Sequence, residues 1–114
     1  MKLLRAVAVL HAVAVCAQPV LAGVYLNGDG AAARIHGPVG LTAAALCLVQ
    51  LVLTWFTSRL SAPFVLTAAV LAGEALMIHS GFGRELALHI PLGLAVVAGS
   101  VALAVRTLRT AVPA

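Results

Sequence analysis

Long apolar runs separated by short polar links dominate the chain and predict a helical membrane protein. Four runs cover approximately residues 3–26, 35–56, 63–79 and 86–105. Because about 20 apolar residues cross the hydrocarbon core of a bilayer as an α-helix, each run predicts one membrane helix. Together with their links, the four runs use nearly the whole length of 114 residues. The expected fold is therefore a single transmembrane domain, 1–114, built as an all-α, integral membrane four-helix bundle.

Composition supports this expectation and excludes several soluble function classes. The chain is 63% hydrophobic and only 9% charged, whereas a soluble domain has about 25% charged residues. It has no glycine-rich nucleotide loop, HExxH motif, Ser/His/Asp pattern or paired carboxylates, so nucleotide and hydrolytic chemistry lack support. Cys16 and Cys47 lie inside apolar runs without zinc-type spacing and are expected to be small buried residues.

Basic residues mark the ends of the runs and predict the orientation in the membrane. With four spans, one side of the membrane collects five basic residues: Lys2, Arg5, Arg59, Arg106 and Arg109. The other side has Arg34 and Arg84, each with an acidic residue nearby. Positive residues favour the cytoplasmic side, so both termini are expected there. Because the basic residues behind the net charge of +4 lie at the ends of the runs and set this orientation, the charge indicates no nucleic-acid partner.

The Ala/Val/Leu/Arg-rich usage suggests a bacterial source, and hence a multi-pass protein of the plasma (inner) membrane. The first run, 3–26, also has features of a cleavable signal peptide, because basic residues precede it and small residues lie near its end. Its apolar stretch is longer than a typical signal core, and the second run needs a partner helix. We therefore expect the first helix to be retained.

The chain contains a weak internal repeat that predicts two similar helical hairpins. Residues 36–41 and 89–94 both read His-x-Pro-x-Gly-Leu, and each stretch opens an apolar run. The sequence Leu-Ala-Gly at 21–23 recurs at 71–73. The number of residues from this sequence to the histidine of the repeat differs by three between the two copies. A pseudo-two-fold axis along the membrane normal would place the second and fourth helices on opposite sides of the bundle interior.

The two repeated histidines, His36 and His89, are the strongest candidates for cofactor binding. Imidazoles inside a membrane face the protein interior or a polar site and commonly have a function. Two of them at matching depth near the outer face predict axial ligands of one haem iron. Gly40 and Gly93, four residues further on, lie on the same helix faces and would let a flat macrocycle approach. The alternative is that the histidines cap helix starts and the glycines allow close helix packing.

Three further residues near the outer side are candidates for contacts with the same cofactor. His79 could replace one of the paired histidines or bond a haem propionate, or it could be an exposed residue at a helix end. Arg34 and Arg84 could pair with propionate carboxylates. Their alternative role is that of ordinary interfacial anchors.

A second polar group is expected deeper in the membrane. Glu74 is a carboxylate within an apolar run and should be protonated or paired there. It could transfer protons, bond His11 or Gln18, orient a ligand histidine, or make a plain structural hydrogen bond. His11 lies about 24 Å from the outer loop at 1.5 Å per residue, too deep to share an iron with the other histidines. Gln18 lies seven residues after His11, on the same helix face.

Residues 18–23, Gln-Pro-Val-Leu-Ala-Gly, the glycine-rich turn after them and the helix led by His36 resemble one four-helix half of the haem A synthase family. The chain is also similar to small b-type membrane cytochromes with two histidine ligands. The resemblance implies haem b held by His36 and His89. Position 33 is alanine where that family typically has a glutamate three residues before a catalytic-half histidine, and Glu85 lies four residues before His89. Only the axial-ligand role is therefore implied.

The expected function is a membrane b-type haem protein that transfers electrons or handles haem, rather than an enzyme. A protein of this size is expected to act as a homodimer or as a subunit of a larger membrane complex. Two alternatives stay open. One is a small proton-coupled transporter that uses Glu74. The other is a cofactor-free accessory subunit whose histidines only join helices.

Overall fold

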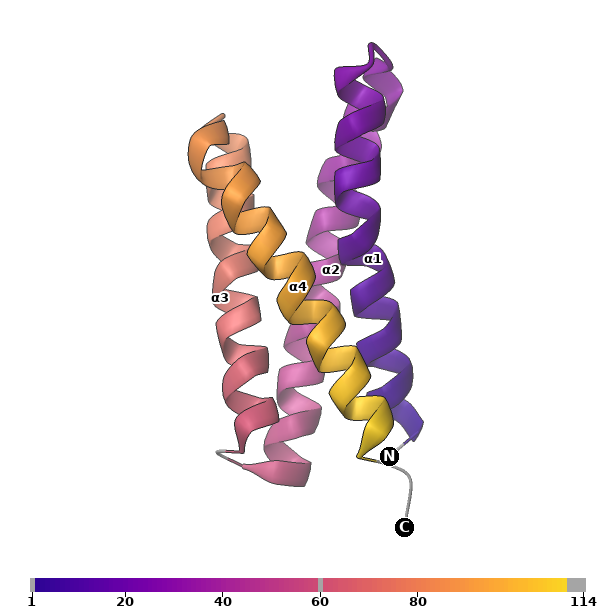
Figure 1. Cartoon of the computed structure of the whole chain (residues 1–114), viewed down its shortest axis with the longest axis vertical. Coiled ribbons are helices and arrows are strands. Elements are labelled where there is room, and N and C mark those ends of the chain that lie inside the picture. Colours follow the sequence, from indigo (N-terminus) through magenta and orange to yellow (C-terminus); the bar gives the residue numbers. More distant parts are fainter. Residues whose placement is uncertain (1, 60, 111–114) are drawn as a thin grey trace.

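The computed structural model describes residues 2–59 and 61–110, and these residues form four α-helices and no strand. The helices are α1 (Lys2–Leu26), α2 (Gly30–Ser58), α3 (Ala62–Phe82) and α4 (Leu86–Arg109) (Figure 1). The expected all-α four-helix bundle is thus confirmed. Residues 1, 60 and 111–114 of the expected domain lie outside the described residues.

The four helices form a closed square in which each helix contacts the next and α4 contacts α1. Within the described ranges, α1 and α3 lie across one diagonal of this square, and α2 and α4 across the other. The expected placement of the second and fourth helices on opposite sides of the interior is therefore confirmed. Both termini lie at the same end of the bundle (Figure 1).

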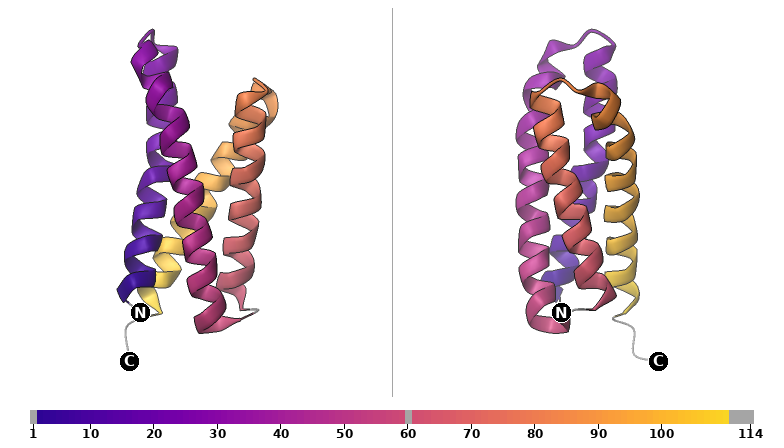
Figure 2. Two further views of the ribbon diagram at one scale, coloured as in Figure 1. Left: turned by 180° about the vertical axis from the view of Figure 1, so that it is seen from behind. Right: turned by 90° about the vertical axis from the view of Figure 1, so that its left-hand side faces the viewer.

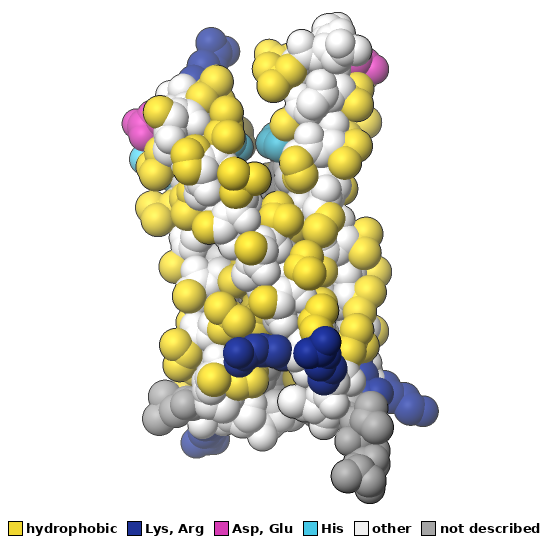
Figure 3. All heavy atoms as spheres, viewed as in Figure 1, with side chains coloured by type: hydrophobic (Ala, Val, Ile, Leu, Met, Phe, Trp, Pro, Cys, Tyr) yellow, Lys and Arg dark blue, Asp and Glu magenta, His cyan; other side chains and the backbone are white. Residues whose placement is uncertain are grey.

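The bundle is closed at the end that carries the termini and open at the other. The α1–α2 hairpin and the α3–α4 hairpin diverge toward the open end, as the left view of Figure 2 shows. Helix α4 begins beside α3 at the open end and crosses to end beside α1 (Figure 1). The space-filling view shows a notch between the hairpins, with histidine side chains at its walls (Figure 3).

The distribution of side chains is that of a membrane protein rather than a soluble one. Leucines such as Leu10, Leu48 and Leu94 point outward and are more than half exposed, whereas Gln50 and Ser100 are fully buried. All four helices are long and apolar enough to cross a membrane. In lipid, polar side chains turn inward to bond between helices because the surrounding tails offer them no partner.

All four helices extend beyond the predicted runs, α1 only to Lys2 and α4 to Arg109 rather than 105. Helix α2 begins at Gly30, because the side chain of Asp29 accepts a hydrogen bond from Ala31 N (2.8 Å) and caps it. Pro38, which would lie in the first turn of a helix that began at residue 35, therefore lies inside α2. Helix α3 does not break after His79 but continues to Phe82, where Gly83 N donates to His79 O (3.0 Å).

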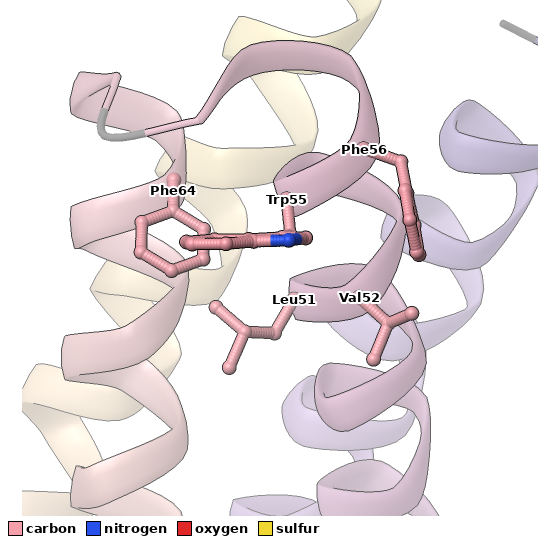
Figure 4. A pocket seen from close by; sticks show the side chains of 5 residues that line it. All are labelled: Leu51, Val52, Trp55, Phe56 and Phe64. Carbon is pink, nitrogen blue, oxygen red and sulfur yellow. The ribbon is translucent and has the colours of Figure 1, made fainter.

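An aromatic groove lies between α2 and α3 near the end with the termini. Figure 4 shows its lining, which is Leu51, Val52, Trp55, Phe56 and Phe64 around a volume of about 400 Å³. The Trp55 and Phe64 ring centres are 5.4 Å apart, and the Arg59 guanidinium lies 5.0 Å from the Trp55 ring. An indole with a cation beside it is typical of the membrane–water interface.

Glycines bring α3 and α4 into close contact. A Cβ built on Gly73 would lie 2.9 Å from Val96 Cγ2, and one built on Gly99 would lie 2.8 Å from Val70 Cγ2. Real Cβ atoms almost never approach another atom this closely, so both positions need the missing side chain. Small residues at helix interfaces allow the backbones to approach and gain van der Waals contact.

We expect Gly73→Ala to destabilise the bundle by about 1–3 kcal/mol, the usual cost of overpacking. The reason is that Val96 is β-branched and stiff and cannot turn away at low cost. Gly23→Ala is the matched control, because nothing lies within 4 Å of a Cβ there. It should leave stability unchanged or raise it by about 0.5–1 kcal/mol. Unfolding of the detergent-purified variants measures both changes, and equal losses would contradict the assigned packing role.

Candidate functional site

His36 on α2 and His89 on α4 face each other across a diagonal of the bundle. Their ring centres are 6.2 Å apart and the rings are inclined by 56°. Both side chains are half-buried. The sequence analysis predicts that these two imidazoles meet, and the structure brings them together.

The separation of the two rings suits a metal ion held between them. Two imidazoles that bind one metal from opposite sides, with nitrogen–metal distances of about 2.0–2.1 Å, have ring centres about 6 Å apart. The inclination of the rings does not affect this separation, because each ring can rotate about its own metal–nitrogen bond. The donor set and its spacing therefore fit bis-histidine ligation.

The ring of His89 is fixed in the tautomer that a metal ligand needs. Its Nδ1 lies 2.8 Å from Met77 O and 3.3 Å from Ser80 Oγ. Since a carbonyl oxygen can only accept, Nδ1 carries the hydrogen and Nε2 keeps its lone pair. A Cβ on Gly81 would come 2.9 Å from His89 Cε1, so this glycine gives the ring its space. Ligand histidines commonly bond a carbonyl in this way through their other nitrogen.

The ring of His36 is positioned by Gln18 of α1. The Gln18 amide is satisfied when its nitrogen donates to His36 Nδ1 (3.0 Å) and His36 O (3.1 Å) and its oxygen accepts from Gly40 N (3.0 Å). In this arrangement the His36 hydrogen is on Nε2. A metal bound through Nε2 would require the hydrogen on Nδ1, and the Gln18 oxygen would then have to face Nδ1. Gln18 therefore controls which tautomer His36 adopts.

The two glycines of the repeat make room for neighbouring side chains. A Cβ on Gly40 would lie 3.5 Å from the Gln18 amide group, and one on Gly93 would lie 3.0 Å from Met77 Cε. Gln18 and Met77 are the residues that position the two histidines, so the glycines act through them. Direct contact of Gly40 and Gly93 with a macrocycle stays a prediction.

The other three outer candidates are exposed. His79 lies on α3 outside the pair formed by His36 and His89, and Arg34 lies on α2 rather than in the link where it was expected. Arg84 lies in the α3–α4 turn with a positive φ of 58°. Their contacts with propionates stay predictions.

A second polar centre lies deeper in the bundle. His11 Nε2 lies 2.7 Å from Glu74 Oε1, and this bond joins α1 to α3 across the other diagonal. His11 is fully buried and Glu74 is 5% exposed. Of the roles open to Glu74, the structure shows the partnership with His11. Gln18, which contacts His36, is seven residues away, or about 10 Å along the helix, so His11 belongs to a separate site.

Several residues of these two centres carry little signal in the sequence. Met77 orients the His89 ring through its backbone carbonyl, and every residue type has this group. Gln50 is different: it is fully buried on α2, and neither its amide nitrogen nor its amide oxygen has a partner among the described residues. A lone amide in an apolar run is a sequence signal for an interior polar position.

No protein-family model, curated protein or solved structure matches this chain. Any assignment of function consequently depends on the residues themselves and their arrangement.

We expect the His11–Glu74 bond to show coupling in a double-mutant cycle. His11→Leu or Glu74→Leu alone leaves a buried polar partner unsatisfied and should cost about 1–3 kcal/mol. The free energy of unfolding that the double variant loses should be about 1 kcal/mol smaller than the sum of the two single losses. This difference is the size of interhelical hydrogen bonds in membrane proteins. Unfolding in detergent measures all four proteins, and additive losses would show that the bond contributes nothing.

Proposed function

We propose that this protein is a membrane b-type cytochrome in which His36 and His89 bind one haem iron. The observation that carries the proposal is the 6.2 Å separation of the two imidazole centres across the bundle. It is supported by the hydrogen bond of each Nδ1 to a neighbouring group, which leaves both Nε2 atoms facing away from their anchors. The resemblance of residues 18–23, the turn after them and the helix led by His36 to one half of the haem A synthase family implies the same ligands.

The residues around the pair have distinct tasks in this proposal. Met77 O and Ser80 Oγ hold the His89 ring and keep its Nε2 unprotonated. After its amide turns, the Gln18 side-chain oxygen would accept a hydrogen bond from Nδ1–H of His36. Haem b, when bound, supplies one-electron chemistry at iron. The apolar helices around the histidines keep water away and so influence the reduction potential.

The charge pattern supports an orientation for this cytochrome. Five basic residues lie in or beside the helix ends near the termini, and two lie near the open end. The positive-inside rule then gives cytoplasmic termini in a bacterial inner membrane and a haem near the outer face. A homodimer or a larger complex would supply the electron partner, and haem handling is the related task for the same site.

Absorbance of the purified protein tests the proposal. We expect about one haem per chain, with a sharp Soret band and split visible bands on reduction, as for bis-histidine haem b. His36→Ala and His89→Ala should each abolish the reduced spectrum. His79→Ala is the matched control, because this exposed histidine lies near the same end of the bundle and should be dispensable.

A colourless wild-type protein from haem-sufficient cells would overturn the proposal. Stabilisation of that protein by lipophilic cations would favour the transporter based on Glu74. Copurification with a stoichiometric membrane partner would favour the accessory subunit. Loss of haem in His79→Ala with retention in His89→Ala would show a different ligand pair.

Gln18 gives a second prediction, on ligand positioning. Gln18→Leu removes the hydrogen bond to His36 Nδ1 and should weaken haem retention about 10–100-fold, as for other residues that orient metal ligands. Gln18→Glu keeps an acceptor at this position, should retain haem, and should lower the reduction potential because the carboxylate strengthens the imidazole as a donor. Haem-transfer rates and redox titration measure the two effects. Unchanged haem retention in Gln18→Leu would contradict the positioning role.

A further inference from the structure

Three residues from three helices bring different metal-binding atoms to one point in the closed half of the bundle. They are His11 of α1, Cys47 of α2 and Glu74 of α3. One ligand atom from each lies within 4.8 Å of the other two, and all three residues are buried. Cys47 is 11 residues from His36, or about 17 Å along α2, so this cluster is separate from the histidine pair.

Hydrogen bonding leaves this cluster incomplete. His11 and Glu74 bond each other through one atom apiece, but His11 Nδ1 and Glu74 Oε2 are buried and have no partner among the described residues. Gln50 lies one helical turn from Cys47 on the same face of α2, and its amide nitrogen and oxygen also lack partners. Buried polar atoms are normally satisfied, and those that are not call for a ligand or a water. The unsatisfied atoms thus point to a group that the cluster can bind.

The chemistry of the donors identifies the class of ligand. Imidazole nitrogen, thiolate sulfur and carboxylate oxygen are the three donors of zinc sites, at about 2.0–2.3 Å from the metal. Calcium and magnesium prefer oxygen ligands alone, and copper(I) prefers thiolates and thioethers. Three protein ligands with a fourth position open are typical of zinc sites that bind water or a substrate group. Tetrahedral ligation places the ligand atoms about 3–4 Å apart. The His11 Nε2–Glu74 Oε1 contact of 2.7 Å would therefore open, and Cys47 Sγ would stay within a small movement of both.

Charge balance also favours a divalent cation. Binding of a divalent ion displaces the proton of the Cys47 thiol, because the thiolate is the form that binds metals. The bound site would hold the dication, one thiolate, one carboxylate and a neutral imidazole, whose charges sum to zero. A neutral site avoids the large cost of a net charge inside a membrane.

We propose that His11, Cys47 and Glu74 form a site for a divalent zinc-type cation in the interior of the bundle. The site joins three of the four helices at one level. It is independent of the proposed haem site, because none of its ligands contacts His36 or His89 among the interactions of the described residues.

Cobalt(II) titration of the purified full chain tests this proposal. The parent protein carries His36→Ala and His89→Ala, which remove haem absorbance and the second pair of imidazoles. We expect one cobalt per chain, visible d–d bands of tetrahedral cobalt and a near-ultraviolet thiolate-to-cobalt band, all displaced by zinc. Cys47→Ser should abolish the thiolate band, and His11→Ala or Glu74→Gln should weaken cobalt binding at least tenfold. Cys16→Ser is the matched control, because Cys16 is the other cysteine of the chain and is exposed on α1.

Absence of stoichiometric cobalt binding would overturn the proposal, as would a thiolate band that survives in Cys47→Ser or vanishes in Cys16→Ser. If a ligand variant does not fold, Cys16→Ser in the same parent provides the second measurement. There, zinc should raise the unfolding temperature and slow the modification of Cys47 by a membrane-permeant maleimide. Zinc without either effect counts against the site. Because the parent lacks the histidine pair, these results are read separately from those on haem.

Discussion

The hydrogen bond between His11 and Glu74 is the constraint on which the architecture depends. In lipid, helices gain little from apolar burial, since the surrounding tails are as apolar as leucine, and association relies on close packing and interhelical polar bonds. This bond spans the α1–α3 diagonal at 2.7 Å. A bond across a diagonal draws opposite corners of the square together, so it also brings α2 and α4 against both helices. The bundle is closed in this half for that reason.

The other diagonal behaves differently at the open end. There the ring centres of His36 and His89 approach to 6.2 Å from α2 and α4, and each ring is held by its own hairpin. Gln18 of α1 holds His36 of α2, while Met77 and Ser80 of α3 hold His89 of α4. Each hairpin therefore presents one oriented imidazole. A group bound between them would complete the second diagonal as the His11–Glu74 bond completes the first.

The sequence predicted the features set by length and repetition. Four apolar runs specify four helices, and the repeated His-x-Pro-x-Gly-Leu stretch specifies that His36 and His89 occupy matching positions. The rotation of each helix about its axis is harder to predict, because helices that are apolar on all sides have no pronounced polar face. Gln18 illustrates this limit. It lies on the same face as His11 by spacing, but the structure places its amide against α2.

Local capping and distant contacts account for the remaining differences. Asp29 extends α2 by a turn beyond its apolar run, which spacing of apolar residues alone does not indicate. Glu74 had several possible partners in the sequence, and only the packing of α1 against its neighbours selects His11. Cys16 and Cys47 were both expected to be small buried residues, and this is wrong for Cys16, which is exposed on α1. Cys47 is buried, and its position beside an imidazole and a carboxylate arises from three helices meeting.

The two hairpins diverge from the closed half of the bundle, so a small tilt of one hairpin moves its outer end by a larger distance. The length of α2 from the level of Cys47 to His36 is about 17 Å at 1.5 Å per residue. A tilt of one hairpin by about 3° then displaces its imidazole by about 1 Å over that length. Metal–ligand bonds tolerate only a few tenths of this displacement. A small change of packing deep among the four helices therefore produces a larger change in the separation of His36 and His89 at the open end.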